Sequence, residues 1–352
     1  MGNRTERTVT EGGTPTTTTY RYNAANELTS VNNVTYTFDA NGNMTQGSRT
    51  YVYNAENQLI QIIDGGSTIA QYEYNEQGLR TKKVAGSLTE YYYYDNGHLS
   101  YITSASNTLK YFFTRDAQGN LLNMIDWTVT PHKTYWYVFN AHQDVLGMVD
   151  NSGQFVVTYK YNAFGEITSS TGTVTTGDGR LLKDANPFRY ASYQYDTESG
   201  FYYLKSRYYI PFMGRYLTKD KVPGHNLYAY CGNNPVNKSD PNGQFVIAWW
   251  VAAIATGLAQ AYVQFGFYHG YNFTKWNSGE WVEFAESALW NIGLNLGFGI
   301  VGKAAWAIGS AVGKIFNLMR TGALGNRAVG IFKIAQNQKY IEIITEMVRN
   351  LR

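Results

Sequence analysis

A tyrosine-rich unit recurs along the first half of the chain and constrains the fold more than any other feature. The unit reads Y-x-[YF]-[ND]-x-x-[NG]-x-[LM]. It is clearest in "YRYNAANEL" from Tyr20, "YTFDANGNM" from Tyr36, "YVYNAENQL" from Tyr51 and "YEYNEQGLR" from Tyr72. Looser copies begin at Tyr91, Tyr111, Tyr137 and Tyr159.

Each unit is predicted to form a β-hairpin. Side chains of a strand alternate between its two faces, so alternating aromatic residues place one row of rings on one face. Asn or Asp followed by Asn or Gly supplies the left-handed backbone positions that a tight turn needs. Repeated hairpins indicate stacked units that share one continuous core. The alternative is an ordinary antiparallel sandwich or a propeller, although the variable spacing is unlike that of propeller blades.

Composition agrees with strands and tight turns. The 352 residues include 31 Tyr and 35 Gly, and only 16% of them are charged. The net charge of +3 is too small to indicate a nucleic-acid partner for the whole chain. One cysteine, Cys231, permits no disulfide within the chain, and the N-terminus lacks the apolar stretch of a signal peptide.

The segment after the repeats, residues 186–243, contains in order "NPFRY", "ESGFYYLKSRYY", "GRYLTKD", "NLYAYCGNNPV" and "DPNG". The repeats resemble YD repeats, and this segment resembles the RHS repeat-associated core. The resemblance implies a mainly β fold, in which an antiparallel sheet is wound into a hollow shell and the core segment plugs one end. It also implies a bacterial polymorphic toxin, related to the C component of insecticidal Tc complexes, whose variable C-terminal effector is held inside. Family shells contain many more repeats, so this chain is expected to close only part of a shell.

In family members that cleave themselves, one arginine and two aspartates near the core release the toxin by an aspartic-protease-like reaction. The resemblance places these roles on Arg207, Asp220 and Asp240. Two close carboxylates cannot both ionise, so one acts as an acid while the other activates water, and a guanidinium steadies the charge. The family cuts after a leucine that follows "DPxG". Here Gln244 occupies that position, and the expected scissile bond is Gln244–Phe245.

The alternative to catalysis is that the same residues have purely structural roles. Asp240 begins an ordinary Asp-Pro-Asn-Gly turn, Asp220 could cap a loop, and Arg207 could brace the plug.

No cofactor or metal is predicted, because the five histidines share no metal-ligand spacing. Cys231 is interpreted as a packed thiol, and "GDGR" from Gly177 as part of a flexible loop.

The tail from Phe245 lacks the repeat pattern and is predicted to be a small α-helical domain. Residues 245–259 carry no charge, and residues 288–316 hold two GxxxG spacings with Lys303 and Lys314. These features favour a membrane-active or pore-forming effector. A non-catalytic helical cargo or linker is one alternative, and a cytosolic toxin enzyme such as a nuclease is another.

The sequence therefore predicts four segments: a flexible segment 1–19, hairpin repeats 20–185, the core 186–243 and a variable helical domain 244–352. The expected partners are the rest of a larger shell, a cognate immunity protein and a target-cell membrane. The expected location is outside the producing cell, after delivery by a secretion system.

Overall fold

The computed structural model describes residues 2–116, 119–222, 224, 226–244, 247–248, 261, 268–269, 280, 283–284 and 287. The chain forms two compact units, Met1–Val236 with Asp240–Val246, and Asn237–Ser239 with Ile247–Arg352. In the second unit, β23 (Lys238–Ser239) pairs antiparallel with β24 (Ile247–Ala248). The helical domain and the membrane-active stretches expected beyond residue 244 lie almost wholly outside the described residues.

The first unit is built from antiparallel sheets in which each strand pairs with its neighbours in sequence. The first sheet holds β1 (Glu6–Glu11), β2 (Thr14–Tyr22), β3 (Leu28–Val31) and β4 (Val34–Thr35). The 14-stranded sheet holds β5 (Thr37–Phe38), β6 (Met44–Gln46), β7 (Thr50–Tyr53), β8 (Leu59–Asp64), β9 (Ser67–Tyr74), β10 (Arg80–Ala85), β11 (Leu88–Asp95), β12 (His98–Ser104), β13 (Leu109–Arg115), β14 (Leu121–Asp126), β15 (Lys133–Phe139), β16 (Val145–Val149), β17 (Phe155–Tyr161) and β18 (Ile167–Thr171). The predicted antiparallel hairpins are confirmed, but they do not form one continuous sheet, because the ladder is interrupted between β4 and β5 and the core segment forms a sheet of its own.

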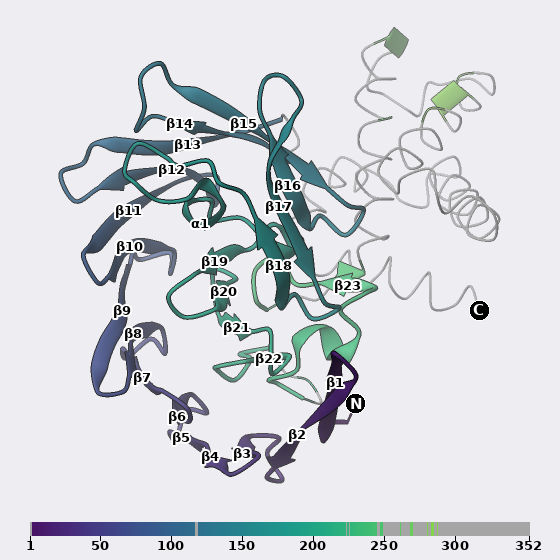
Figure 1. The fold of residues 1–352 in the computed structure, drawn as a ribbon. Coiled ribbons are helices and arrows are strands. Elements are labelled where there is room, and N and C mark those ends of the chain that lie inside the picture. Colours follow the sequence, from purple (N-terminus) through teal and green to yellow (C-terminus); the bar gives the residue numbers. More distant parts are fainter. Residues whose placement is uncertain are drawn as a thin grey trace. The chain divides into compact units, whose positions relative to one another are not determined.

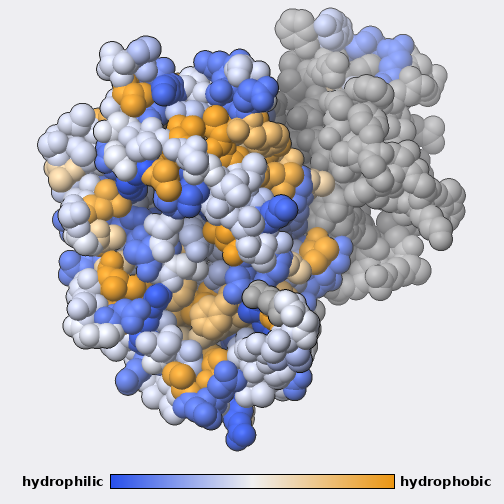
Figure 2. Space-filling model, in the orientation of Figure 1, coloured by the Kyte–Doolittle hydropathy of each residue, from blue (hydrophilic) through white to orange (hydrophobic). Residues whose placement is uncertain are grey.

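The core segment forms a small sheet inside the curve of the long one (Figure 1). The short helix α1 (Leu182–Ala185) precedes the core segment, which contains η1 (Tyr190–Ser192), β19 (Gln194–Asp196), β20 (Phe201–Tyr203), β21 (Tyr208–Ile210), β22 (Arg215–Tyr216) and η2 (Tyr230–Asn233). Side chains of this small sheet share one hydrophobic core with the inner face of the first hairpins. On the face seen in Figure 2, hydrophobic residues lie in small groups among hydrophilic ones.

Most turns of the repeats share one hydrogen-bond pattern. In the turn after β7, the Asn54 side-chain oxygen accepts a hydrogen bond from the backbone N–H of Gln58 at 2.8 Å. The backbone N–H of Asn54 donates to the carbonyl of Gln58, and Asn57 adopts the left-handed conformation with φ 63°. Asp39, Asn75 and Asn162 accept the equivalent bond in their own turns. The Asn/Asp and Asn/Gly positions of the unit are therefore requirements of one turn geometry.

The two aromatic residues of the unit have different roles. The first lies in the core, as Tyr51 and Tyr72 do at 3% exposure each. The second reaches back to the preceding hairpin, where its hydroxyl donates to a backbone carbonyl. Tyr53 bonds to the carbonyl of Met44 at 2.8 Å and Tyr74 to that of Leu59 at 2.6 Å. Where this second aromatic residue is Tyr53 or Tyr74, the hairpin is thereby tied to the one before it, and a buried hydroxyl gains a partner.

The N-terminal residues differ from the expectation of a flexible segment 1–19. Residues 6–22 form the hairpin β1–β2. This segment is rich in threonine, a β-branched residue that favours strands. Arg7 pairs with Glu166 at 2.5 Å, and the Arg4 guanidinium lies 4.1 Å from the ring centroid of Phe164. These contacts join the first hairpin to the turn between β17 and β18.

Arg80 departs from the repeat pattern, because it occupies the position that other units fill with Leu28, Met44 or Leu59. It is 1% exposed and pairs with the equally buried Asp196 of the core segment at 2.5 Å. Its guanidinium also lies 4.7 Å from the ring centroid of Tyr203. A buried arginine needs such partners, so this position ties the sheet to the core segment.

We predict that Arg80→Leu, which restores the residue typical of the repeat, destabilises the protein by about 3–5 kcal/mol, because it leaves Asp196 buried without its closest countercharge. Denaturant unfolding followed by tyrosine fluorescence measures the loss. The control is Lys82→Met, which breaks the exposed pair with Glu73 and should change stability little. Equal losses in the two variants would refute the anchoring role of Arg80.

Candidate self-cleavage site

The structure brings together the three residues that the sequence singled out. Arg207 precedes β21, Asp220 follows β22, and Asp240 opens the turn 240–243. The Arg207 Nη2 atom lies 2.7 Å from Asp220 Oδ2 and 3.6 Å from Asp240 Oδ2. One guanidinium therefore bridges two carboxylates that are separated in the sequence.

Arg207 also holds the chain next to the expected scissile bond. Its Nε donates to the carbonyl of Gly243, and its Nη1 donates to the carbonyl of Leu227 at 3.0 Å. The guanidinium carbon lies 3.6 Å from the ring centroid of Tyr216, a cation–π contact. With its side chain 6% exposed, Arg207 is fixed from several sides.

Asp240 is fully buried and is held by two tyrosines. Tyr216 donates its hydroxyl hydrogen to Asp240 Oδ2 at 2.6 Å, and the backbone N–H of Asp240 donates to the Tyr193 hydroxyl at 2.7 Å. Neither tyrosine was predicted as a site residue. Tyr216 lies four residues before Asp220 within "GRYLTKD", but nothing in that motif indicates which carboxylate its hydroxyl meets.

Asp220 is the more accessible carboxylate, with its side chain 14% exposed. Burial raises the pKa of Asp220 above its usual range, the Arg207 charge opposes this rise, and the Asp240 charge adds to it. The backbone N–H of Val222 donates to its other oxygen at 2.9 Å. The surroundings of Asp220 therefore favour a retained proton more than those of a free aspartic acid do.

The turn 240–243 places Gln244 beside this pair. Gly243 has φ 77°, and a Cβ atom there would lie 2.8 Å from Ser206 Oγ and 3.0 Å from the Leu204 carbonyl, so only glycine fits. The Ser206 hydroxyl donates to the Asn242 carbonyl at 2.6 Å. The peptide is thus held in one position up to Gln244. Phe245, on the far side of the expected scissile bond, lies outside the described residues.

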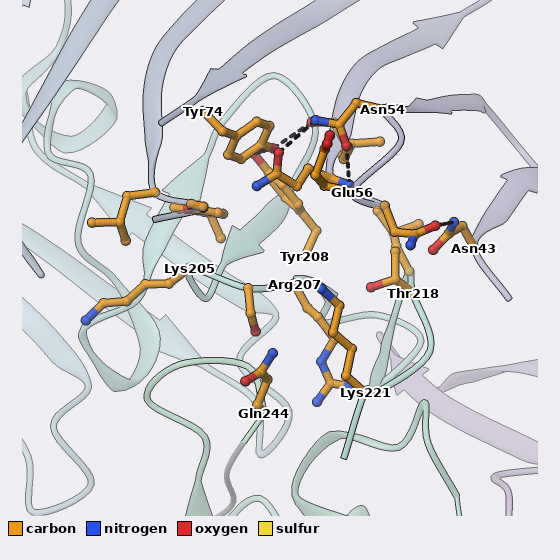
Figure 3. A pocket seen from close by; sticks show the side chains of 18 of the residues that line it. Asn43, Asn54, Glu56, Tyr74, Lys205, Arg207, Tyr208, Thr218, Lys221 and Gln244 are labelled. Carbon is orange, nitrogen blue, oxygen red and sulfur yellow. Dashed lines mark hydrogen bonds between the residues drawn. The ribbon is translucent and has the colours of Figure 1, made fainter. Parts of the chain in front are cut away.

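A cavity of about 1000 Å³ opens beside the site, and Asp220, Arg207 and Gln244 are among the residues that line it. Figure 3 shows Gln244 across the cavity from Asn54 and Glu56 of a repeat turn. Side-chain amides of the turns and the core segment line it together with charged and aromatic residues, so the lining is of mixed polarity.

The other sequence candidates lie apart from this site. Cys231 is buried in a cluster of tyrosines, as the packed-thiol interpretation predicts. The expected flexible loop around "GDGR" is instead anchored, because Arg180 pairs with the buried Glu90 at 2.7 Å and Asp178 with Lys110 at 2.7 Å. Among the described residues, no group of three or more His, Cys, Asp or Glu side chains is arranged to hold a metal ion.

No helix within the described residues is long and apolar enough to span a membrane.

Comparison with known proteins gives relatives along most of the chain. The tRNA3(Ser)-specific nuclease WapA of Bacillus spizizenii is 37% identical over 258 residues, which are 70% of this chain and 11% of that protein. The tRNA nuclease WapA of Bacillus subtilis is 34% identical over 317 residues, 87% of this chain and 12% of that protein. The toxin protein Tse5 of Pseudomonas aeruginosa is 38% identical over 78 residues, 21% of this chain and 6% of that protein. The chain thus spans only a small part of these relatives.

Among solved structures, the Photorhabdus luminescens Tc holotoxin pore aligns with 64% of this chain and 13% of that chain, with a TM-score of 0.49 and 19% identity.

The profile of the teneurin YD-shell matches residues 2–236, which is well over half of the chain and includes every strand from β1 to β22. The repeat turns, the inward tyrosines and the enclosed core segment described above all fall within this match. The chain therefore belongs to the teneurin YD-shell family of RHS/YD-repeat proteins and is related to bacterial toxins.

Proposed function

We propose that this chain is the closing part of a toxin shell, which holds a C-terminal effector and releases it by cutting the chain after Gln244. The observation that carries the proposal is the convergence of Arg207, Asp220 and Asp240 beside Gln244. The kinship with WapA nucleases and with Tse5 supports a toxin.

The proposed reaction is hydrolysis of the Gln244–Phe245 bond. Asp240 takes a proton from a water molecule that attacks the Gln244 carbonyl carbon. Asp220 gives its proton to the leaving amide nitrogen as the carbon–nitrogen bond breaks, and Arg207 stabilises the charge that develops. Arg207 donates a hydrogen bond to the neighbouring carbonyl of Gly243, and this bond positions the substrate peptide.

The assembly and the delivery of this chain are proposed from its relatives. We infer that the rest of a larger shell completes the enclosure, because this chain spans 11–12% of the length of the WapA proteins. A cognate immunity protein would protect the producing cell, and delivery would take the shell outside it.

The nature of the effector has two candidates. A membrane-active tail agrees with the low charge and the GxxxG spacings of residues 288–316. One observation favours a nuclease. The similarity to the tRNA nuclease WapA of Bacillus subtilis covers 87% of the chain, which is more than the share that residues up to Gln244 make up. The similarity therefore continues into the tail.

We predict that the purified chain separates on a denaturing gel into residues 1–244 and 245–352. Asp220→Asn and Asp240→Asn should each leave a single band, because either change removes one half of the acid–base pair. Asp184→Asn, an exposed carboxylate outside the site, is the matched control. A wild-type chain that stays whole through folding and storage would contradict cleavage.

We predict that cleavage slows as pH rises. The raised pKa of Asp220 means that its proton is retained to a higher pH than in a free aspartic acid, and the acid form is lost as pH passes through that pKa. The measurement is the first-order cleavage rate of protein refolded at a series of pH values. A rate that increases steadily from pH 4 to pH 8 would exclude Asp220 as the acid.

We predict that residues 245–352 expressed alone arrest growth from one side of the membrane only. Arrest in the cytosol with loss of intact tRNA would support the nuclease, whereas arrest only after periplasmic export, with dye leakage from anionic liposomes, would support membrane action. Gly297→Ile should weaken leakage if helices meet at the GxxxG spacings. No arrest from either side would leave the cargo or linker alternative.

A further inference from the structure

Tyr216 contacts both an aspartate and the arginine of the candidate self-cleavage site. Its hydroxyl donates to Asp240 Oδ2 at 2.6 Å, a length typical of O–H···O⁻ bonds. The guanidinium carbon of Arg207 lies 3.6 Å from the centroid of the Tyr216 ring, and Arg207 Nη2 lies 3.6 Å from the same Asp240 oxygen. Tyr216 therefore touches the carboxylate and the guanidinium at the point where the two meet.

The position of Tyr216 is set by β22 and by the aromatic rings around it. Tyr216 is paired with Tyr209 of β21, and its backbone N–H donates to the carbonyl of Tyr228 at 2.9 Å. The rings of Tyr209 and Tyr230 lie 5.8 Å and 6.0 Å from the Tyr216 ring, measured between centroids. Because Tyr216 is only 1% exposed, this packing holds its hydroxyl in one direction, toward Asp240.

A second tyrosine holds the backbone of Asp240. The N–H of Asp240 donates to the Tyr193 hydroxyl at 2.7 Å, and the hydroxyls of Tyr193 and Tyr230 lie 3.0 Å apart within hydrogen-bond distance. Asp240 is thus attached to the tyrosine cluster through its backbone and, at Tyr216, through its side chain. Since Asp240 is fully buried, the Tyr216 hydroxyl supplies a hydrogen-bond donor that water supplies to an exposed carboxylate.

Tyr216 keeps its proton in this environment. Burial and then the Asp240 charge raise the pKa of Tyr216 above its usual range, while the Arg207 charge opposes the rise. The other titratable groups around this hydroxyl and its carboxylate partner are Asp220, Tyr193 and Cys231. A phenol that stays protonated can donate to Asp240 throughout the reaction, but it does not act as the acid or the base.

We propose that Tyr216 is a positioning residue for the cleavage reaction, because it holds the carboxylate of Asp240 and the guanidinium of Arg207 in fixed positions. A hydroxyl that donates to a carboxylate stabilises the charged form, which is the form that takes a proton from water. The ring face beneath Arg207 keeps its guanidinium oriented toward both aspartates. This inference rests on the cleavage proposed above and adds a residue that acts through Asp240 and Arg207.

The test compares Tyr216→Phe with the wild-type full chain. Phenylalanine retains the ring beneath Arg207 and removes only the hydroxyl. The first-order cleavage rate is measured on denaturing gels at a series of pH values, and circular dichroism checks that each protein is folded. We expect the variant to cleave about 10–100-fold more slowly, because Asp240 is less well positioned. The acidic limb of its rate profile should move about 1–2 pH units toward higher pH, because the charged carboxylate loses a hydrogen bond.

Two further variants separate positioning from stability. Tyr92→Phe is the matched control, because Tyr92 is also buried and its hydroxyl donates to the buried Glu90 at 3.0 Å, outside the candidate site. This variant should leave the cleavage rate and its pH profile unchanged. Tyr216→Leu removes the ring as well as the hydroxyl, so it should cleave more slowly than Tyr216→Phe.

The outcomes distinguish this inference from the cleavage itself. A wild-type chain that does not cleave overturns both. If the wild-type chain cleaves and Tyr216→Phe matches it in rate and in acidic limb, the role of Tyr216 is refuted and the cleavage reaction stands. Equal slowing in Tyr216→Phe and Tyr92→Phe, without a shift of the acidic limb, would show a loss of stability alone and would also refute the positioning role.

Discussion

The side-chain oxygen at the Asn/Asp position of most repeats makes the interaction on which the rest of the structure depends. It accepts the backbone N–H four residues on, as Asn54 does from Gln58 and Asn75 from Leu79, and so fixes the length of the turn. In a strand, a slip of one residue would turn every side chain to the opposite face. A fixed turn length therefore keeps the tyrosine rows on the inner face and makes a long curved sheet possible.

The enclosed core segment depends on this inner face, yet hydrophobic contact alone does not fix its position. Buried ion pairs do, because their geometry is specific. Asp196 of the core segment pairs with Arg80 at 2.5 Å and with Lys83 at 3.3 Å, both from β10. Buried charges are costly unless paired, so any displacement of the segment is penalised. The same logic applies to Arg207, which bridges Asp220 and Asp240 and so makes the candidate site part of the framework.

The sequence identified some residues of the candidate self-cleavage site and missed others. The motifs identified Arg207, Asp220 and Asp240, and the structure places all three around one guanidinium. Tyr216 could not be identified, because its bond to Asp240 joins residues 24 positions apart across the packed core.

The sequence by itself determined the hairpins, their turns and the inward tyrosine rows, because these follow from periodicity and from hydrogen bonds within a few residues. Only the tertiary structure decided which side chains meet across the interior. Arg80 was hidden in a repeat position usually filled by leucine, and its partner Asp196 lies 116 residues away. Such pairs form because the curvature of the sheet carries β10 to the core segment. Curvature accumulates over many strands, so the spacing of residues within one repeat does not predict it.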